Sequence, residues 1–266
     1  MKRVFEPTRK TLLDVVRTNL RAANKSSYIT RVLYIGKYNG AESKFLQKMD
    51  SVIKYLKDDV RDVLISGMFL VYPKHYIHLL EAPEDIIYKH LKAFYEKYTE
   101  DCNLGRSVFL PFYHHIHQRF FTDWFYIYTT PPTLLESLGS HELSEIKTHV
   151  TNCLTKIYVL SYKISNKMRD QSISMADVAR NVCNKDARDL PENTVVEYLI
   201  NTISPVLLSV EEYLKTYSSV PFINLYQDSI WPPPHDFMFS GASARHDRPS
   251  IEVTSSKQHI LPDPHH

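Results

Sequence analysis

The stretch VLISGMFLVYPKHYIHLLEA, from Val63 to Ala82, decides the fold of this chain. It consists of two apolar runs separated by Pro73 and Lys74. Near-continuous hydrophobicity is typical of strands that are covered on both faces, so the stretch predicts the central strand pair of a sheet. The rest of the chain must then supply cover for both faces of that sheet.

Helical patterns stand on both sides of this strand pair. Residues 41–56 carry apolar side chains at helical spacing, and residues 84–98 do the same. Pro83 precedes the second segment, where proline is well suited to the start of a helix, and two acidic residues follow it. We therefore expect two amphipathic helices that pack against the sheet.

Three further segments predict strands. Residues 28–35 are rich in β-branched and aromatic residues and end at Gly36, which indicates a strand that closes in a turn. Residues 107–116 and 120–130 are rich in aromatic residues, and Pro111 in the first indicates an edge or a bulge. The order βαββαββ predicts an α+β, ferredoxin-like sheet with both helices on one face.

The second half of the chain predicts helices that cover the other face of the sheet. In residues 133–220, a long apolar stripe from Leu143 to Ile164 indicates a helix that opens near Ser140, a suitable N-cap. Further helices are expected at residues 175–183 and 191–217, the latter interrupted near Ser204 and Pro205.

The two ends of the chain differ from its middle. Residues 1–27 predict a basic amphipathic helix or arm, either docked on an acidic partner or laid on its own domain with a solvated basic face. Residues 221–266 hold 7 of the 15 prolines together with five large aromatic side chains. This composition favours an extended segment that lies along a partner or back along its own domain.

Composition limits the class of protein. The chain has 266 residues with a formal net charge of +2, so neither a nucleic-acid nor a membrane partner is expected. Its three cysteines are widely spaced without a CxxC motif, which fits a reducing compartment. With neither a membrane span nor a signal sequence in the pattern, we expect an intracellular protein of the cytoplasm or cytoskeleton.

Catalytic motifs are missing from the sequence. The 6 glycines form no GxGxxG and no P-loop, and there is no GxSxG. Asp58, Asp59 and Asp62 echo a DDxxD magnesium motif, but they end a helix before a strand, which favours a solvated linker. The sequence therefore predicts that the protein is not an enzyme.

A histidine cluster is the densest run of candidate metal ligands. His114, His115 and His117 form HHxH, and on a strand the last two would share one face. Because no cysteine or carboxylate lies nearby to complete tetrahedral coordination, surface histidines on an edge strand are preferred over a zinc site. No metal is expected.

Residues 28–132 resemble a BLUF domain, the flavin-binding blue-light sensor fold. The resemblance is carried by four segments, RVLYIG, ISGMFLVY, HYIHLLEAPED and QRFFTDW, which follow the family patterns LxYxS, ITGxLxY, FxQxLEG and RxFxxW. It implies a flavin site built from a tyrosine on the first strand, an asparagine that holds the ring and a switching glutamine on the third strand.

The chain departs from this family at the positions that carry its photochemistry. Tyr34 matches the tyrosine and Trp124 the tryptophan, but Asp59 stands at the asparagine position and His78 at the glutamine position, while Tyr126 replaces a methionine. Aspartate lacks amide donors, and histidine cannot undergo the rotation of an amide. We therefore expect a retained scaffold in which Tyr34 and Trp124 pack against the two helices, without a cofactor.

The whole chain is also similar to a small family of proteins that carry a degenerate BLUF-like domain. That resemblance implies a sperm flagellar setting among axonemal accessory proteins. The function expected from it is a non-catalytic interaction protein, held by protein partners in a larger assembly. The alternative is a sensor that binds flavin, as FAD or FMN, with altered photochemistry.

Overall fold

A computed structural model describes residues 11–22, 27–61, 63–133, 138, 142–169, 174–185 and 187–219 of the chain. The helices and strands in chain order are α1 (Leu12–Ala22), β1 (Thr30–Tyr38), α2 (Glu42–Asp59), β2 (Ser66–Val71), β3 (His75–Ala82), α3 (Glu84–Tyr98), β4 (Leu104–Phe109), β5 (Trp124–Tyr128), α4 (Leu143–Arg169), α5 (Met175–Lys185), a short 3-10 turn (Ala187–Asp189), α6 (Asn193–Asn201) and α7 (Val210–Tyr217).

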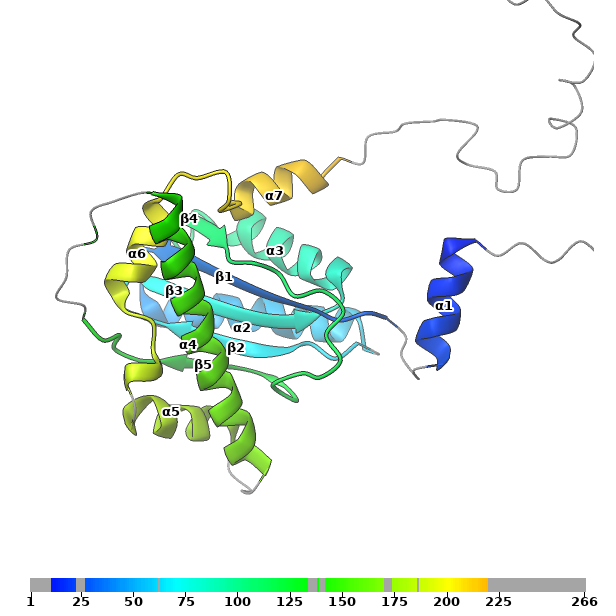
Figure 1. Cartoon of the computed structure of the whole chain (residues 1–266), viewed down its shortest axis with the longest axis horizontal. Coiled ribbons are helices and arrows are strands. Elements are labelled where there is room, and N and C mark those ends of the chain that lie inside the picture. Colours follow the sequence, from blue (N-terminus) through cyan, green and yellow to red (C-terminus); the bar gives the residue numbers. More distant parts are fainter. Residues whose placement is uncertain are drawn as a thin grey trace, which may run out of the picture. The chain divides into compact units, whose positions relative to one another are not determined.

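The five strands form one mixed sheet in the order β4-β1-β3-β2-β5 (Figure 1). β3 is the central strand and pairs antiparallel with β1 and β2, and β4 extends β1 antiparallel. β5 adds to β2 in parallel. The first four strands with α2 and α3 form the split βαβ arrangement, so the predicted ferredoxin-like α+β fold is confirmed.

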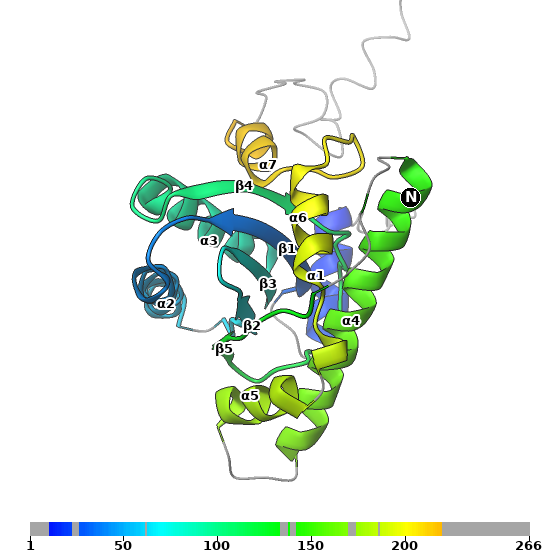
Figure 2. The same ribbon diagram turned by 90° about the vertical axis from the view of Figure 1, so that its left-hand side faces the viewer.

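Both faces of the sheet are covered, as the continuous hydrophobicity of Val63–Ala82 predicted. Every residue of β2 and β3 is buried. One face packs against α2 and α3, together with the first turns of α7, and the other packs against α4, α5 and α6. Figure 2 shows the sheet almost end-on between these two sets of helices.

Alternate strand residues divide between the two cores. On β1, Val32 and Tyr34 face α2 and α3, while Leu33 and Ile35 face α4 and α6. Because successive side chains of a strand point to opposite faces, this alternation fixes the face on which Tyr34 lies.

Gly67 allows β2 to lie close to β3. Its φ is 157°, and an added Cβ would lie 2.2 Å from the backbone oxygen of Leu79. Only glycine fits such an approach, because the obstructing atom belongs to the backbone of the central strand.

Three strand predictions were wrong in their limits. β1 does not close at Gly36 but continues to Tyr38, because Gly36 still pairs with Tyr76 and Ser107. β4 ends at Phe109, so the expected strand over residues 107–116 is mostly an irregular segment. β5 begins at Trp124 rather than at residue 120. β4 is an edge strand, as Pro111 in the expected segment indicated, although Pro111 itself follows the strand; β5 forms the other edge.

The second half of the chain is helical, as predicted. Ser174 caps α5 by accepting a hydrogen bond from the Asp177 N–H at 3.3 Å, and the chain is irregular between α6 and α7 around Ser204 and Pro205. Ser140, the predicted cap of α4, lies outside the described residues, as do most of the basic arm and the whole segment 221–266.

α1 confirms the amphipathic helix expected near the N-terminus, and none of its residues is buried. Among the described helices, none combines the length and the apolar composition that crossing a bilayer requires.

Candidate functional site

Three strands bring together Tyr34, Trp124 and His78, the last of which stands at the family's glutamine position. Tyr34 and His78 are register partners on β1 and β3, and Phe69 on β2 is the partner of His78 on the other side. Register partners in an antiparallel pair share a face, so their side chains meet beneath α2 and α3. α3 contributes a fourth polar side chain, His90, from its buried stripe.

The four side chains form a single chain of hydrogen bonds. The indole Nε1–H of Trp124 donates to Nε2 of His78 at 2.9 Å. The Tyr34 hydroxyl lies 2.6 Å from Nδ1 of His78 and 3.0 Å from Nε2 of His90. Tyr34, His78 and His90 have no exposed surface, and Trp124 is only 7% exposed.

Donor chemistry fixes the direction of this chain. Indole nitrogen can only donate, so Nε2 of His78 must accept and the proton of a neutral His78 must sit on Nδ1. Nδ1–H then donates to the Tyr34 oxygen. Because the Tyr34 hydroxyl bonds only to these two histidines within the described residues, Nε2 of His90 is the acceptor left for its proton. The hydrogen bonds therefore run from Trp124 through His78 and Tyr34 to His90.

The shifted pKa values indicate that both histidines are neutral. Burial, joined by repulsion from His90, lowers the pKa of His78 well below its usual 6.5. Burial lowers the pKa of His90 from 6.5 to about 3. Burial also raises the pKa of Tyr34 well above 10.0, with Tyr76 adding to the shift. The network therefore holds no charge near neutral pH.

The network ends in a buried donor. With its Nε2 accepting, neutral His90 carries its proton on Nδ1, and this nitrogen has no hydrogen-bond partner among the described residues. The His90 ring is parallel to that of Phe94 at a centroid distance of 6.3 Å and edge-on to His78 at 5.1 Å. His90 thus fills space between α3 and the sheet as well as ending the chain of bonds.

This arrangement does not fit a flavin. A flavin ring would require planar space and free polar partners, yet Tyr34 and His78 direct their polar atoms at each other and at Trp124 and His90. The ring of Phe69 closes on His78 at a centroid distance of 5.0 Å. The chain's own side chains therefore occupy the space in which these residues meet.

Asp59 and Tyr126, which replace the family's asparagine and methionine, lie apart from the network. Asp59 is the last residue of α2 and is exposed, with its carboxylate 3.4 Å from Nζ of Lys89 on α3. Tyr126 lies on β5 and is 37% exposed, with its ring 6.1 Å from that of Trp124. Of the five positions, the structure joins Tyr34, His78 and Trp124 by hydrogen bonds and leaves Asp59 and Tyr126 outside.

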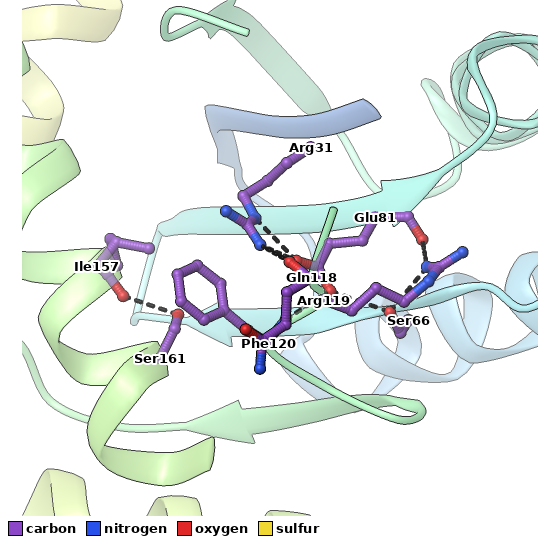
Figure 3. A network of polar contacts seen from close by, with 8 residues as sticks. All are labelled: Arg31, Ser66, Glu81, Gln118, Arg119, Phe120, Ile157 and Ser161. Carbon is purple, nitrogen blue, oxygen red and sulfur yellow. Dashed lines mark hydrogen bonds and ion pairs between the residues drawn. The ribbon is translucent and has the colours of Figure 1, made fainter. Parts of the chain in front are cut away.

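A second polar cluster lies at the other end of β1 and β3 (Figure 3). Glu81 is completely buried, and Nε and Nη2 of Arg31 each lie 2.7 Å from its Oε1. Ser66 donates to Oε2 at 3.1 Å, and the Phe120 N–H reaches both carboxylate oxygens at 3.1 Å. The carboxylate is thus paired and hydrogen-bonded, as a buried charge requires.

This cluster fastens the segment that leads into β5. Nη1 of Arg119 donates to Ser66 Oγ at 3.0 Å and to the Glu81 carbonyl, and its Nη2 donates to the Leu64 carbonyl at 2.8 Å. The guanidinium of Arg31 lies 3.9 Å from the centre of the Phe120 ring. We conclude that the cluster has a structural role, because it anchors residues 118–120 just before Trp124.

The HHxH cluster does not lie on a strand, which corrects the sequence interpretation. His115 has a φ of 56°, and its ring contacts that of Tyr28 at a centroid distance of 4.2 Å, tilted by 36°. His114 lies 3.4 Å from the Thr30 hydroxyl, and its ring centroid is 6.5 Å from that of His115. Within the described part of the chain, no three histidine, cysteine or acidic residues gather as a metal site would require.

Sequence reasoning missed His90 and the partners of Glu81. His90 occupies the apolar stripe of its helix, next to Ile87, Leu91 and Phe94 along that face, and a histidine in such a stripe is a signal for a buried polar partner. Glu81 is the one acidic residue in the run from Val63 to Ala82, and a charge within a buried strand predicts a cationic partner such as Arg31.

Solved structures that match part of this chain include a light-regulated cyclase and two proteins named BlrB and BlrP1. A bacterial light-regulated adenylyl cyclase is 19% identical, with a TM-score of 0.30 over 50% of this chain and 36% of the cyclase chain. The BLUF protein BlrB in its dark state is 16% identical, with a TM-score of 0.29 over 39% of this chain and 74% of BlrB. BlrP1 of Klebsiella pneumoniae is 15% identical, with a TM-score of 0.27 over 38% of this chain and 24% of BlrP1.

Similarity at this level supports no inference about function, and the chain spans about a third of the length of the cyclase. The match to a family model is more extensive. The model described as Testis-expressed protein 47 matches residues 28–219, which include the whole sheet and the helices α2 to α7. Because this match covers well over half of the sequence, the chain belongs to the testis-expressed protein 47 family.

Proposed function

We propose that this protein is a non-catalytic interaction protein, and specifically an accessory component of the sperm flagellar axoneme built on a degenerate BLUF-like scaffold. The buried chain from Trp124 to His90 carries the proposal. Because the polar atoms of Tyr34, His78 and Trp124 are used in hydrogen bonds within the protein, none of them is left there to bind a flavin or to respond to its excitation. The remaining role for the domain is to present surfaces to protein partners.

The state of the reactive side chains supports the absence of catalysis. All three cysteines are buried. Burial raises the pKa of Cys153 from 9.0 to about 12 and that of Cys183 to about 11. The thiolate is the nucleophilic form of cysteine, so these residues are poor nucleophiles near neutral pH. His78 and His90 have no exposed surface through which a substrate could reach them.

Membership of a testis-expressed family supports a setting in the male germ line. The axoneme is the finer proposal, and it rests on the resemblance of the whole chain to flagellar proteins. Contacts with partners are assigned to the ends of the chain. α1 exposes 80% of Leu12 and 54% of Leu13, and residues 221–266 carry five large aromatic side chains among their prolines.

Incorporation into flagella tests this proposal. Tagged full-length chain and a chain that lacks residues 221–266 would be expressed in developing sperm, and detergent-extracted axonemes would be probed for each. A third chain, with Phe222, Tyr226, Trp231, Phe237 and Phe239 all replaced by serine, keeps the length of the tail. We expect the full chain in the axonemal fraction and both altered chains to be depleted. Normal incorporation of the truncated chain, or absence of the full chain from axonemes, would contradict the proposal.

A further inference from the structure

A groove lies between the end of α3, the start of β4 and the first turns of α7. It has a volume of about 550 Å³, which is within the usual range for sites that bind small ligands or side chains. In Figures 1 and 2, α7 lies beside both α3 and β4, at the edge of the sheet away from β5. Leu104 and Leu214, both half-buried, supply the apolar surface of its lining, while Val210 beside them is completely buried.

The walls of the groove are held in place by hydrogen bonds. Ser209 and Glu212 form a reciprocal capping box at the start of α7, with bonds of 3.0 and 3.1 Å between backbone and side chain. The Phe109 N–H donates to the Leu208 carbonyl at 2.8 Å, which joins the entry of α7 to β4. A ligand would therefore meet a preformed surface, and little ordering would oppose its binding.

The charge of the groove favours a cationic ligand. Two exposed carboxylates line it, Glu96 on α3 and Glu211 on α7. The cation in the lining, Arg106, directs Nη1 at the carbonyls of Ile200 and Thr202, at 2.6 and 2.7 Å. Lys92 lies 3.9 Å from Glu96 as an exposed pair one helical turn away, a contact that contributes little.

We propose that this groove binds a short segment of a partner protein in which a lysine or arginine lies beside an apolar side chain. The apolar side chain would pack on Leu104 and Leu214, and the cation would pair with Glu96 or Glu211. Acidic phosphates of nucleic acids and anionic lipids are disfavoured by the same two carboxylates. This inference rests on the proposed interaction function and adds one surface of the domain to the contacts assigned to the two ends of the chain.

Selection from a phage-displayed library of random dodecapeptides on the immobilised full chain tests the proposal. Enriched peptides would be synthesised, and their affinities measured by fluorescence anisotropy. We expect a basic residue next to an aliphatic or aromatic residue in the selected peptides. The double variant Glu96→Lys, Glu211→Lys should bind them about tenfold or more weakly, and added salt should weaken binding to the unaltered chain.

The matched control is Glu145→Lys, which also removes an exposed acidic residue from the first turn of a helix, but on α4. It should leave peptide affinity unchanged. Three results would overturn the proposal: failure to enrich any peptide, selected peptides without a basic residue, or equal affinity for the double variant. A chain that is dimeric by light scattering and becomes monomeric in the double variant would instead assign the groove to a second copy. None of these results bears on whether the chain is incorporated into axonemes, so the peptide experiment and the incorporation experiment can fail independently.

Discussion

Replacing Tyr34 with phenylalanine should remove the central hydroxyl of the buried network while keeping the packing of the ring. The hydroxyl accepts from Nδ1 of His78 at 2.6 Å and donates to Nε2 of His90 at 3.0 Å, between residues with no exposed surface. The substitution therefore leaves one buried donor and one buried acceptor without partners. Each unsatisfied group costs about 1–3 kcal/mol, so the loss of both bonds should lower the free energy of unfolding by about 2–6 kcal/mol.

Urea unfolding of the full chain, followed by far-ultraviolet circular dichroism, measures this loss. Tyr38→Phe is the matched control, because Tyr38 is also buried and its hydroxyl donates to a single backbone carbonyl, that of Tyr72, at 2.8 Å. A carbonyl keeps a second lone pair, and the control should cost about 1 kcal/mol. If Tyr34→Phe destabilises the protein no more than Tyr38→Phe does, the Tyr34 hydroxyl does not bridge the two buried histidines.

A double-mutant cycle separates the bond from other effects of the substitution. His90→Leu removes the acceptor of the Tyr34 proton, so combining it with Tyr34→Phe deletes the same hydrogen bond twice. The two losses of stability should therefore add to more than the loss in the double variant. Strict additivity would show that Tyr34 and His90 do not interact.

Other predictions follow from the same contacts. Stability should fall as the pH drops from 6.5 towards 3, since the pKa values of both His78 and His90 are depressed by burial. An unfolded histidine has a pKa of about 6.5, so the unfolded chain binds more protons in this window, and the loss at pH 5 should be about 2 kcal/mol per histidine. His90→Phe should flatten this dependence in urea titrations at several pH values, and an unchanged slope would count against buried neutral histidines. Glu81→Gln leaves Arg31 without its buried counter-charge and should lower the free energy of unfolding by about 3–5 kcal/mol. The control Asp50→Asn breaks an exposed pair with Lys54 at 2.7 Å and should lower it by less than about 1 kcal/mol. Equal losses of stability in thermal melts would exclude the anchoring role of Glu81. Gly67→Ala places a Cβ 2.2 Å from the Leu79 backbone oxygen, so it should lower the midpoint of thermal unfolding sharply or prevent folding. A midpoint close to that of the unaltered chain would show that β2 and β3 do not lie so close together.

The fold was predictable where a local period matched a buried face. The helical spacing of Phe45, Met49, Val52, Ile53 and Leu56 predicted the buried face of α2, and all five are buried. The continuous hydrophobicity of β2 and β3 likewise predicted cover on both faces. Such patterns are decided by neighbours in sequence, which is why they survive in the folded protein.

The irregular segment after β4 was not predictable from the same signals. Tyr113 and its aromatic neighbours favour a strand by composition. Beyond Phe109, however, the segment meets β1 through a bond from the Leu110 N–H to the Leu33 carbonyl and an isolated bridge between Arg31 and Tyr113. A strand needs a partner along its length, and the partner is set by tertiary structure rather than by propensity. The same limit explains why the three histidines of HHxH share no strand face.

The site was predictable in part. Tyr34, His78 and Trp124 were identified individually, but their hydrogen bonds depend on the register of β1 against β3 and on the parallel addition of β5. His90 joins them from α3 across the core. No spacing in the sequence predicts that His90 contacts Tyr34 in particular. The substitution of histidine at the glutamine position was therefore visible in the sequence, whereas its consequence, a closed chain of four side chains, required the structure.

The chain's own side chains fill the place where Tyr34, His78 and Trp124 meet, which is where flavin contacts would be expected from the resemblance. The most direct test is the absorption spectrum of the purified full-length protein after incubation with excess FAD or FMN and removal of free flavin by gel filtration. The closed network predicts absorption in the ultraviolet alone, with no flavin band in the protein fraction. A flavin band at about 450 nm that elutes with the protein in a fixed ratio to it would contradict the account.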